Sequence, residues 1–133
     1  MAYFLAKTDL ATYSIDDLER DGTTTWDGVR NAAALQAIRA MRTGDEVLIY
    51  HSQGEAAIVG LARVISEPRP DPKDSKSWVV DVAFVRRLEQ PVTLREIKEG
   101  HMFDDWSLVR QGRLSTMGVP DNVIAWLKEN KGL

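Results

Sequence analysis

The chain of 133 residues contains no cysteine, which excludes a disulfide framework and any thiolate metal site. It has only two histidines, His51 and His101, and neither stands in a spacing typical of metal ligands. No apolar run approaches the roughly 20 residues that a membrane-spanning helix needs. The apolar start, residues 1–6, is short and lacks the basic lead-in of a secretion signal. We therefore expect a cytoplasmic protein that holds no metal or other cofactor and depends on packing for its stability.

Basic residues are too few for a protein that coats nucleic acid without regard to its bases. The chain has 17 Lys and Arg against 20 Asp and Glu, a net charge of −3, whereas such coating needs surplus positive charge to displace counterions. Two stretches nevertheless lack acidic residues: 30–42 holds three arginines, and 106–118 holds Arg110 and Arg113. If these stretches meet in space, they create a basic face on an acidic body.

Hydrophobic periodicity and end signals predict short strands and helices along most of the chain. We expect strands at residues 3–6, 46–50, 56–65 and 77–88, and helices at residues 15–20, 31–42, directly after Thr93, and at 122–130. Ser14 with Asp17, and Thr93 with Glu96, have the spacing of capping boxes. The proline-rich residues 68–72 predict a surface loop, and the ambiguous residues 104–114 are interpreted as a helical turn that leads into an extended segment.

The order of these elements favours an α+β domain. Short, irregularly spaced strands that alternate with short helices fit a curled sheet or small barrel better than a doubly wound parallel sheet. No internal repeat, low-complexity tract or linker is visible, so we expect residues 1–133 to form one domain.

Residues that could support catalysis are scarce. His51 and Ser52 could be interpreted as a base and a nucleophile, but neighbours in a strand point to opposite faces and cannot share a proton directly. The isolated glycines Gly54, Gly60 and Gly112 do not form a phosphate-binding motif. We therefore expect no catalytic residues and a protein that is not an enzyme.

Four segments combine apolar and polar residues at predicted element boundaries, where side chains can converge on a pocket: residues 26–31, 50–52, 108–110 and 113–115. Each residue taken singly has a simpler explanation. Trp26 suits a core, Asn31 a helix cap and Ser52 a turn. Arg110 and Arg113 suit a solvated surface.

Taken together, the segments resemble the EVE domain family of the PUA-like superfamily, which includes the thymocyte nuclear protein type. The resemblance runs from Tyr3 to about Leu127. It is carried by WDGVRN at 26–31, RAMRTGDEVLIYHS at 39–52, IVGLA at 58–62 and LVRQGRLS at 108–115.

The resemblance implies a twisted, partly closed mixed β-barrel of about five to six strands flanked by short helices. It also implies a non-catalytic pocket, related to that of the YTH readers of methylated RNA, that recognises a modified base, notably a modified cytosine in DNA. By position, the residues implied to line it are Trp26, Asn31, Ser52, Leu108, Arg110 and Ser115, with Lys7, Arg30 and Arg113 at a phosphate-binding rim. The implied partner is DNA or RNA carrying a modified base, bound by a monomer that can associate with nucleic-acid-processing enzymes.

The chain departs from the family pattern at two places near this pocket. It has Thr8-Asp9-Leu10 where many relatives have Ser-Glu-Pro, and three alanines, residues 32–34, where relatives often carry larger polar or basic residues. Three other functions stay open. The same pocket could bind a free nucleoside or metabolite, Ser52 or His51 could serve an enzyme, or the aromatic surface could bind protein.

Overall fold

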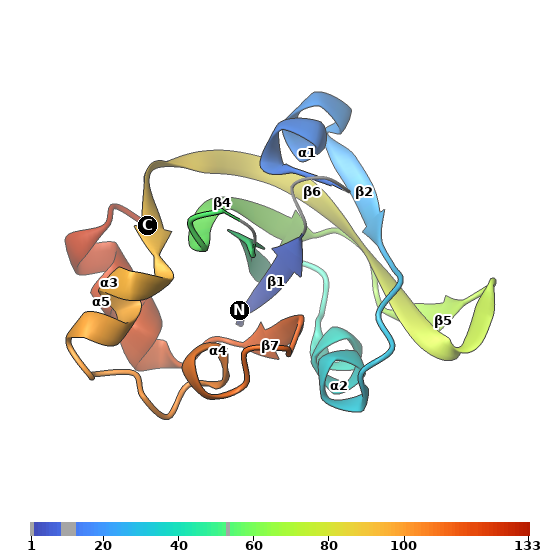
Figure 1. Cartoon of the computed structure of the whole chain (residues 1–133). Helices are drawn as coiled ribbons and strands as arrows, with labels where there is room; N and C mark the ends of the chain where they lie inside the picture. Colours follow the sequence, from blue (N-terminus) through green and yellow to red (C-terminus); the bar gives the residue numbers. More distant parts are fainter. Residues whose placement is uncertain (1, 9–12, 53) are drawn as a thin grey trace.

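The computed structural model describes residues 2–8, 13–52 and 54–133, and its centre is a strongly curled sheet (Figure 1). The strands are β1 (Tyr3–Thr8), β2 (Thr23–Trp26), β3 (Glu46–His51), β4 (Ala57–Val64), β5 (Arg69–Asp71), β6 (Asp74–Thr93) and β7 (Thr116–Gly118). The helices are α1 (Ile15–Asp21), α2 (Ala32–Ala40), α3 (Leu94–Glu99), α4 (Ser107–Arg110) and α5 (Asp121–Asn130).

The sheet is a mixed, partly closed barrel, as expected. Its strand order is β2-β6-β4-β3-β1-β7, and β5 pairs with β6 outside this path. The β1–β3 pair is parallel, and the other pairs are antiparallel. The 20-residue β6 arches over the sheet and carries β2 at one end of the order, while β7 lies at the other (Figure 1). Because β2 and β7 are not paired with each other, the barrel is left open between them.

Side-chain caps start three of the helices. Ser14 Oγ accepts a hydrogen bond from the Asp17 backbone N–H at 3.2 Å, and Thr93 Oγ1 accepts one from the Glu96 N–H at 3.1 Å. Both carboxylates reach back to the cap backbone, which confirms the two predicted capping boxes. Asn31 Oδ1 accepts from the second and third residues of α2, as a helix cap does.

Three strands differ from the prediction because tertiary pairing decides them. The β2 strand was not expected, and it exists by pairing with β6 along Thr23–Trp26. The proline-rich segment expected as a loop contains β5, where Pro70 is tolerated because only one edge of that strand is paired. The strand expected at 77–88 runs much further at both ends.

Most of the remaining elements follow the prediction. The helical turn expected within residues 104–114 is α4, but the strand that follows it, β7, begins only at Thr116, beyond the segment in which an extended stretch was expected. The closing helix was expected at 122–130 and is α5, with Val123 and Leu127 buried. The core lies inside the curled sheet and under α1, α2 and α5, where Leu5, Leu48 and Ile58 are fully buried. Among the helices of the described ranges, none has both the length and the apolar character required to cross a membrane.

Candidate nucleic-acid interface

A pocket of about 430 Å³ lies at the open seam of the barrel. One wall comes from the end of β1 and from Ser115, which precedes β7; the other comes from β2 and the loop after it. The described residues that line it are Lys7, Thr8, Tyr13, Thr24, Thr25, Trp26, Asp27, Gly28, Val29, Arg30 and Ser115. This volume falls within the roughly 300–1,000 Å³ typical of small-ligand sites.

Trp26 forms part of the wall that β2 supplies. Side chains alternate along the strand, so Thr24 and Trp26 are half-buried on one face while Thr23 and Thr25 are exposed on the other. Trp26 lies opposite Val80 of β6 and packs against the edge of the hydrophobic core. Thr25 Oγ1 donates to Asp81 Oδ1 at 2.7 Å and so helps to hold β2 on β6. The indole is therefore anchored by the sheet yet still lines the pocket.

The loop after β2 is held in a defined shape. Gly28 has a φ of +74°, a conformation that residues with a side chain rarely adopt. Val29 is buried, and its carbonyl accepts a 2.7 Å hydrogen bond from the buried Ser77 hydroxyl. Arg30 is then directed to solvent, with 85% of its side chain exposed and Nε 3.9 Å from Asp74 Oδ2. The loop thus presents Asp27 and Arg30 at the pocket.

Lys7 supplies a half-buried cation from the facing wall. Its backbone N–H donates to the Ser115 carbonyl at 2.8 Å, and its ammonium donates to the Gly112 carbonyl at 2.9 Å. The ammonium also lies 5.6 Å from the centroid of the Tyr50 ring, within the range of a cation–π contact. Burial lowers the pKa of Lys7 below its ordinary value.

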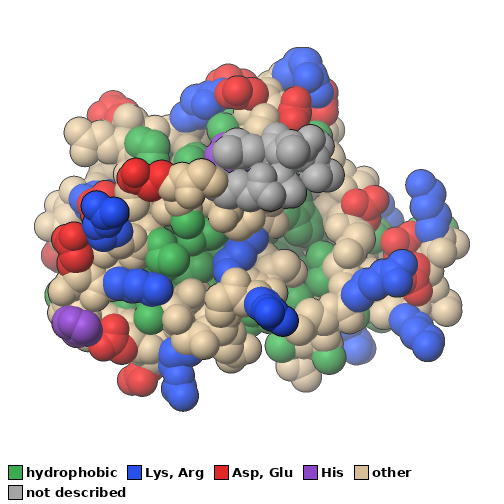
Figure 2. Space-filling model, viewed as in Figure 1, with side chains coloured by type: hydrophobic (Ala, Val, Ile, Leu, Met, Phe, Trp, Pro, Cys, Tyr) green, Lys and Arg blue, Asp and Glu red, His purple; other side chains and the backbone are tan. Residues whose placement is uncertain are grey.

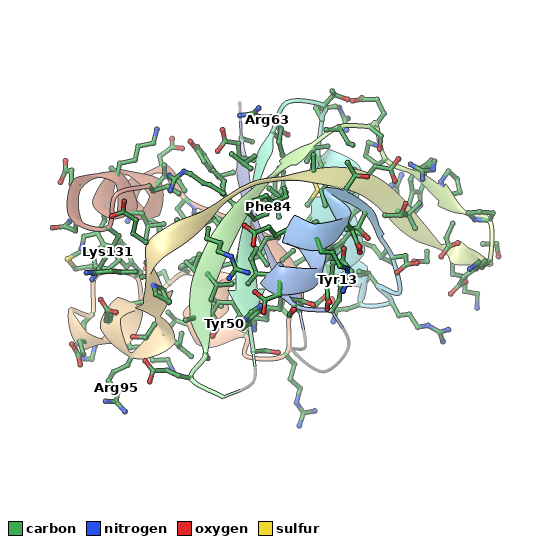
Figure 3. The ribbon with its side chains drawn as sticks, turned by 90° about the horizontal axis from the view of Figure 1, so that it is seen from above. Tyr13, Tyr50, Arg63, Phe84, Arg95 and Lys131 are labelled. Atoms are coloured by element: carbon green, nitrogen blue, oxygen red, sulfur yellow. The ribbon has the colours of Figure 1, made fainter. Side chains whose placement is uncertain are left out.

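Tyr13 closes another side of the pocket, next to α1 (Figure 3). Its hydroxyl donates to Asp21 Oδ2 at 2.9 Å, and its carbonyl accepts a hydrogen bond from the Thr8 hydroxyl. Burial is the largest cause that raises the pKa of Tyr13, so the phenol stays protonated near neutral pH. Tyr13 therefore links strand β1 to helix α1 at the pocket.

The structure brings together some of the predicted site residues. Trp26, Ser115, Lys7 and Arg30 all line the pocket. Asn31 follows Arg30 and is exposed, but its Oδ1 caps α2 at 2.9 Å from Ala33 N and 3.2 Å from Ala34 N.

The other predicted residues lie outside the pocket lining. Ser52 is exposed and contacts the Thr8 carbonyl through its backbone N–H at 3.2 Å. Leu108 is 2% exposed and belongs to the core. Arg110 and Arg113 are exposed, and Arg110 lies 4.0 Å from Asp105. These two arginines flank Gly112, the residue whose carbonyl holds Lys7.

His51 does not face Ser52 as a base would. The His51 ring is buried, and its Nε2 accepts a hydrogen bond from the backbone N–H of Ile15 at 3.1 Å. The Ser52 hydroxyl instead lies 3.4 Å from the Thr8 carbonyl, to which it donates. Within the described ranges, no group of three His, Asp or Glu side chains is arranged to hold a metal ion.

The pocket residues that sequence reasoning did not select are Thr8, Tyr13, Thr24, Thr25, Asp27, Gly28 and Val29. Asp27 lies inside the WDGVRN segment and could have been selected with Trp26. The three β-branched threonines before Trp26 could have indicated a strand, and alternation would then have placed Thr24 beside the tryptophan. Tyr13 precedes the helix cap, a position that by itself indicates only packing.

Charge around the pocket is unevenly distributed. Helix α2 packs against β7, so the two stretches without acidic residues lie side by side. Below the grey residues in Figure 2, the middle of this face shows Lys and Arg side chains, whereas Asp and Glu side chains lie toward its edges. Two arginines near this face already have protein partners. Arg39 of α2 lies over the Trp78 ring at 4.7 Å, and Arg42, which follows α2, lies 3.8 Å from Glu67.

Residues 2–130 match the family model described as the EVE domain. Human thymocyte nuclear protein 1 is 37% identical over 108 residues, which cover 67% of this chain and 48% of that protein. The chain therefore spans about half the length of the curated relatives it matches.

Solved structures extend the similarity over the whole chain. Protein Atu2648 of Agrobacterium tumefaciens is 31% identical with a TM-score of 0.93, covering 100% of this chain and 94% of that one. Human THYN1 protein in complex with DNA containing 5-methylcytosine is 26% identical with a TM-score of 0.89, covering 100% and 99%. A YTH domain of Zygosaccharomyces rouxii, solved with N6-methyladenosine RNA, shares the fold at 16% identity and a TM-score of 0.56, covering 96% and 84%.

Proposed function

The chain belongs to the EVE domain family, and from this we propose that it binds nucleic acid carrying a modified base and holds that base in the Trp26 pocket. The proposed ligand is a modified cytosine in DNA, because the human relative with the same fold was solved with DNA containing 5-methylcytosine. The observation that carries the proposal is the half-buried indole on the wall of a pocket large enough for one base. The proposed role is recognition without catalysis.

The physical requirement on such a reader is compensation for taking a base out of its stack. Extrusion from a duplex costs a few kcal/mol, and stacking of a base on an aromatic ring returns about 1–3 kcal/mol. Trp26 is proposed to supply that stacking, and the hydroxyl of Ser115 is a candidate hydrogen-bonding group on the opposite wall. The remaining free energy has to come from contacts to the sugar and phosphates.

Arginines around the pocket are proposed to supply the phosphate contacts. Arg30 is almost fully exposed on the β2 side, and Arg110 and Arg113 are exposed on the other. Guanidinium groups form charge-assisted, often bidentate bonds with phosphate and position the strand without reading its sequence. Asn31 and Ser52 are proposed to support the site from its margins, and Leu108 from the core beneath it.

Replacement of Trp26 by alanine tests the proposal. We expect Trp26→Ala to weaken binding to a 5-methylcytosine oligonucleotide by about tenfold or more, since stacking contributes about 1–3 kcal/mol. Fluorescence anisotropy measures the loss, and Trp26→Phe, which keeps a ring, should recover part of it.

Trp126→Ala is the matched control for stability. Trp126 is also half-buried but packs against Phe103, away from the pocket. Both alanine variants should lower the melting temperature, while only Trp26→Ala should lose affinity. Equal affinity of Trp26→Ala and the unchanged chain for the methylated oligonucleotide would refute the proposed site.

A free nucleoside or similar small molecule is the alternative ligand for the same pocket. Calorimetry separates the two, because phosphate contacts contribute only when a strand is bound. We expect a methylated oligonucleotide to bind much more tightly than free 5-methyl-2′-deoxycytidine. Equal affinity would favour the small-molecule function, and parallel titration with RNA of the same sequence tests the choice of polymer.

A further inference from the structure

The pocket has an ammonium on one wall, from Lys7, and a carboxylate on the facing wall, from Asp27, next to the exposed Arg30. Lys7 presents an ammonium that is half-buried and held by the Gly112 carbonyl and the Tyr50 ring. In the described ranges, no carboxylate lies within ion-pair distance of this ammonium. An ammonium has three N–H donors, and the Gly112 carbonyl accepts one of them. Among the residues that the structure describes, the other two donors have no hydrogen-bond acceptor and are proposed to serve a ligand.

Asp27 presents an acceptor on the facing wall. It follows Trp26 directly, lines the pocket and is exposed. Across residues 2–8, 13–52 and 54–133, its carboxylate makes no hydrogen bond or ion pair. Two aspartates of the neighbouring β6 do have such partners: Asp74 lies near Arg30, and Asp81 pairs with Arg69. The left-handed Gly28 and the buried Val29 fix the turn that presents Asp27. Asp27 is thus an acceptor without a protein partner in the described structure.

A base stacked on Trp26 would meet a donor from one wall and an acceptor from the other. Cytosine-type bases have the complementary pattern, an exocyclic amino donor at N4 beside the acceptors N3 and O2. A carboxylate is suited to accept from cytosine N4. Thymine and uracil carry a carbonyl at the same place, and two acceptors facing each other repel.

We propose that Asp27 sets the base preference of the pocket by accepting from the exocyclic amine of a cytosine-type base, while Lys7 holds either pyrimidine by donating to its O2 carbonyl. This inference rests on the proposed function and adds the residues that would distinguish a cytosine-type base from thymine or uracil. It gives Lys7 a role different from the rim phosphate contact expected from the sequence. It also assigns a binding role to Asp27.

The test compares two bases in otherwise identical single-stranded oligonucleotides, where neither base has to leave a duplex. One oligonucleotide carries 5-methylcytosine and the other thymine, which differ at position 4 and in the ring nitrogen N3. We expect the unchanged chain to prefer 5-methylcytosine by about tenfold or more, the size of one good base contact. Fluorescence anisotropy supplies both dissociation constants.

The two pocket variants should behave differently. Asp27→Asn should bring the affinities for 5-methylcytosine and thymine close to each other, because an amide can donate to a carbonyl as well as accept from an amine. Lys7→Met should weaken both oligonucleotides by similar factors, because both bases keep an O2 acceptor. Glu89→Gln and Lys98→Met, exposed and outside this pocket, are the matched controls and should change neither constant.

Unchanged preference in a folded Asp27→Asn variant would overturn the role of Asp27. Unchanged affinity in a folded Lys7→Met variant would overturn the role of Lys7. Either result leaves the Trp26 pocket standing, provided that the unchanged chain binds 5-methylcytosine. If the unchanged chain binds no modified oligonucleotide, the proposed function fails and this inference fails with it. Thermal melting establishes that each variant is folded.

Discussion

His51 joins the central sheet to helix α1 through one buried hydrogen bond. Its Nε2 accepts from the backbone N–H of Ile15, the first residue of α1. Only a neutral ring with an unprotonated Nε2 can accept this bond. Burial is the largest cause that lowers the pKa of His51; Asp16 opposes this effect and Arg87 adds to it. The folded chain therefore resists protonation of this ring more than the unfolded chain does.

This residue makes stability depend on pH. The folded pKa of His51 lies below its ordinary value of 6.5, so its contribution is complete above 6.5 and declines as pH falls below it. We expect the melting temperature to fall between about pH 7 and 5, and His51→Gln, which keeps an acceptor, to reduce that slope. An unaltered slope in His51→Gln would contradict the prediction.

Sequence reasoning succeeds for single residues where the chemistry is local. Ser14, Thr93 and Asn31 cap helices because each side chain bonds backbone only two or three residues away, so spacing alone predicts the bond. Leu108 shows the limit. An apolar residue in a family segment suits a pocket wall and a core equally, and only the packing of distant elements places it in the core.

At the level of elements, helix α1 packs closely on β4 because Gly60 has no side chain. A Cβ on Gly60 would lie 2.5 Å from Ile15 Cδ1 and 3.2 Å from the Arg86 carbonyl oxygen. Ile15 is buried and can move little. We expect Gly60→Ala to destabilise the chain by about 1–3 kcal/mol through overpacking, measured by chemical denaturation.

Gly118 provides the matched control for this substitution. It also lies in a strand, but a Cβ there would meet no atom within 4 Å. Gly118→Ala should therefore leave stability nearly unchanged. If Gly118→Ala lost as much stability as Gly60→Ala, the loss would be a general effect of replacing a strand glycine. That result would contradict the explanation by the close contact between α1 and β4.

The strands that escaped prediction are those with little apolar content of their own. Thr23, Thr24 and Thr25 form a strand because β6 pairs with them. Pro70 is tolerated in β5 because the edge of β5 that faces away from β6 is unpaired and needs no backbone N–H donor. The long strands β3 and β4 bury most of their residues and were predicted from that pattern. The pocket lies beside β2, so the wall that holds Trp26 could be located only once the pairing of β2 was known.

For the molecule as a whole, the curl of the sheet brings residues far apart in sequence to one seam. Lys7, Trp26 and Ser115 come from the beginning and the end of the chain, and the strand order places β1 and β7 opposite β2 across the opening. The resemblance to a family predicted this partly closed barrel. Composition and periodicity reached only a curled sheet or small barrel, because neither reveals which strands pair.

The same curl sets basic stretches beside the pocket on a chain whose net charge is −3. An acidic body repels nucleic acid except at that face. Each arginine at the rim of the pocket should therefore contribute equally to the affinity for oligonucleotides of any sequence. We expect Arg113→Ala to weaken methylated and unmethylated oligonucleotides by similar factors. For single-stranded oligonucleotides, the slope of log affinity against log salt concentration should be shallower in this variant by about 0.7, the amount expected for the loss of one phosphate contact.

Arg95→Ala is the control for this charge effect. Arg95 is an exposed arginine on α3, labelled in Figure 3, and lies outside the Trp26 pocket. Both variants change the net charge equally, so a long-range effect of charge would alter both salt slopes alike. A direct phosphate contact would alter only that of Arg113→Ala. Equal slopes in the two variants would remove Arg113 from the phosphate-binding rim.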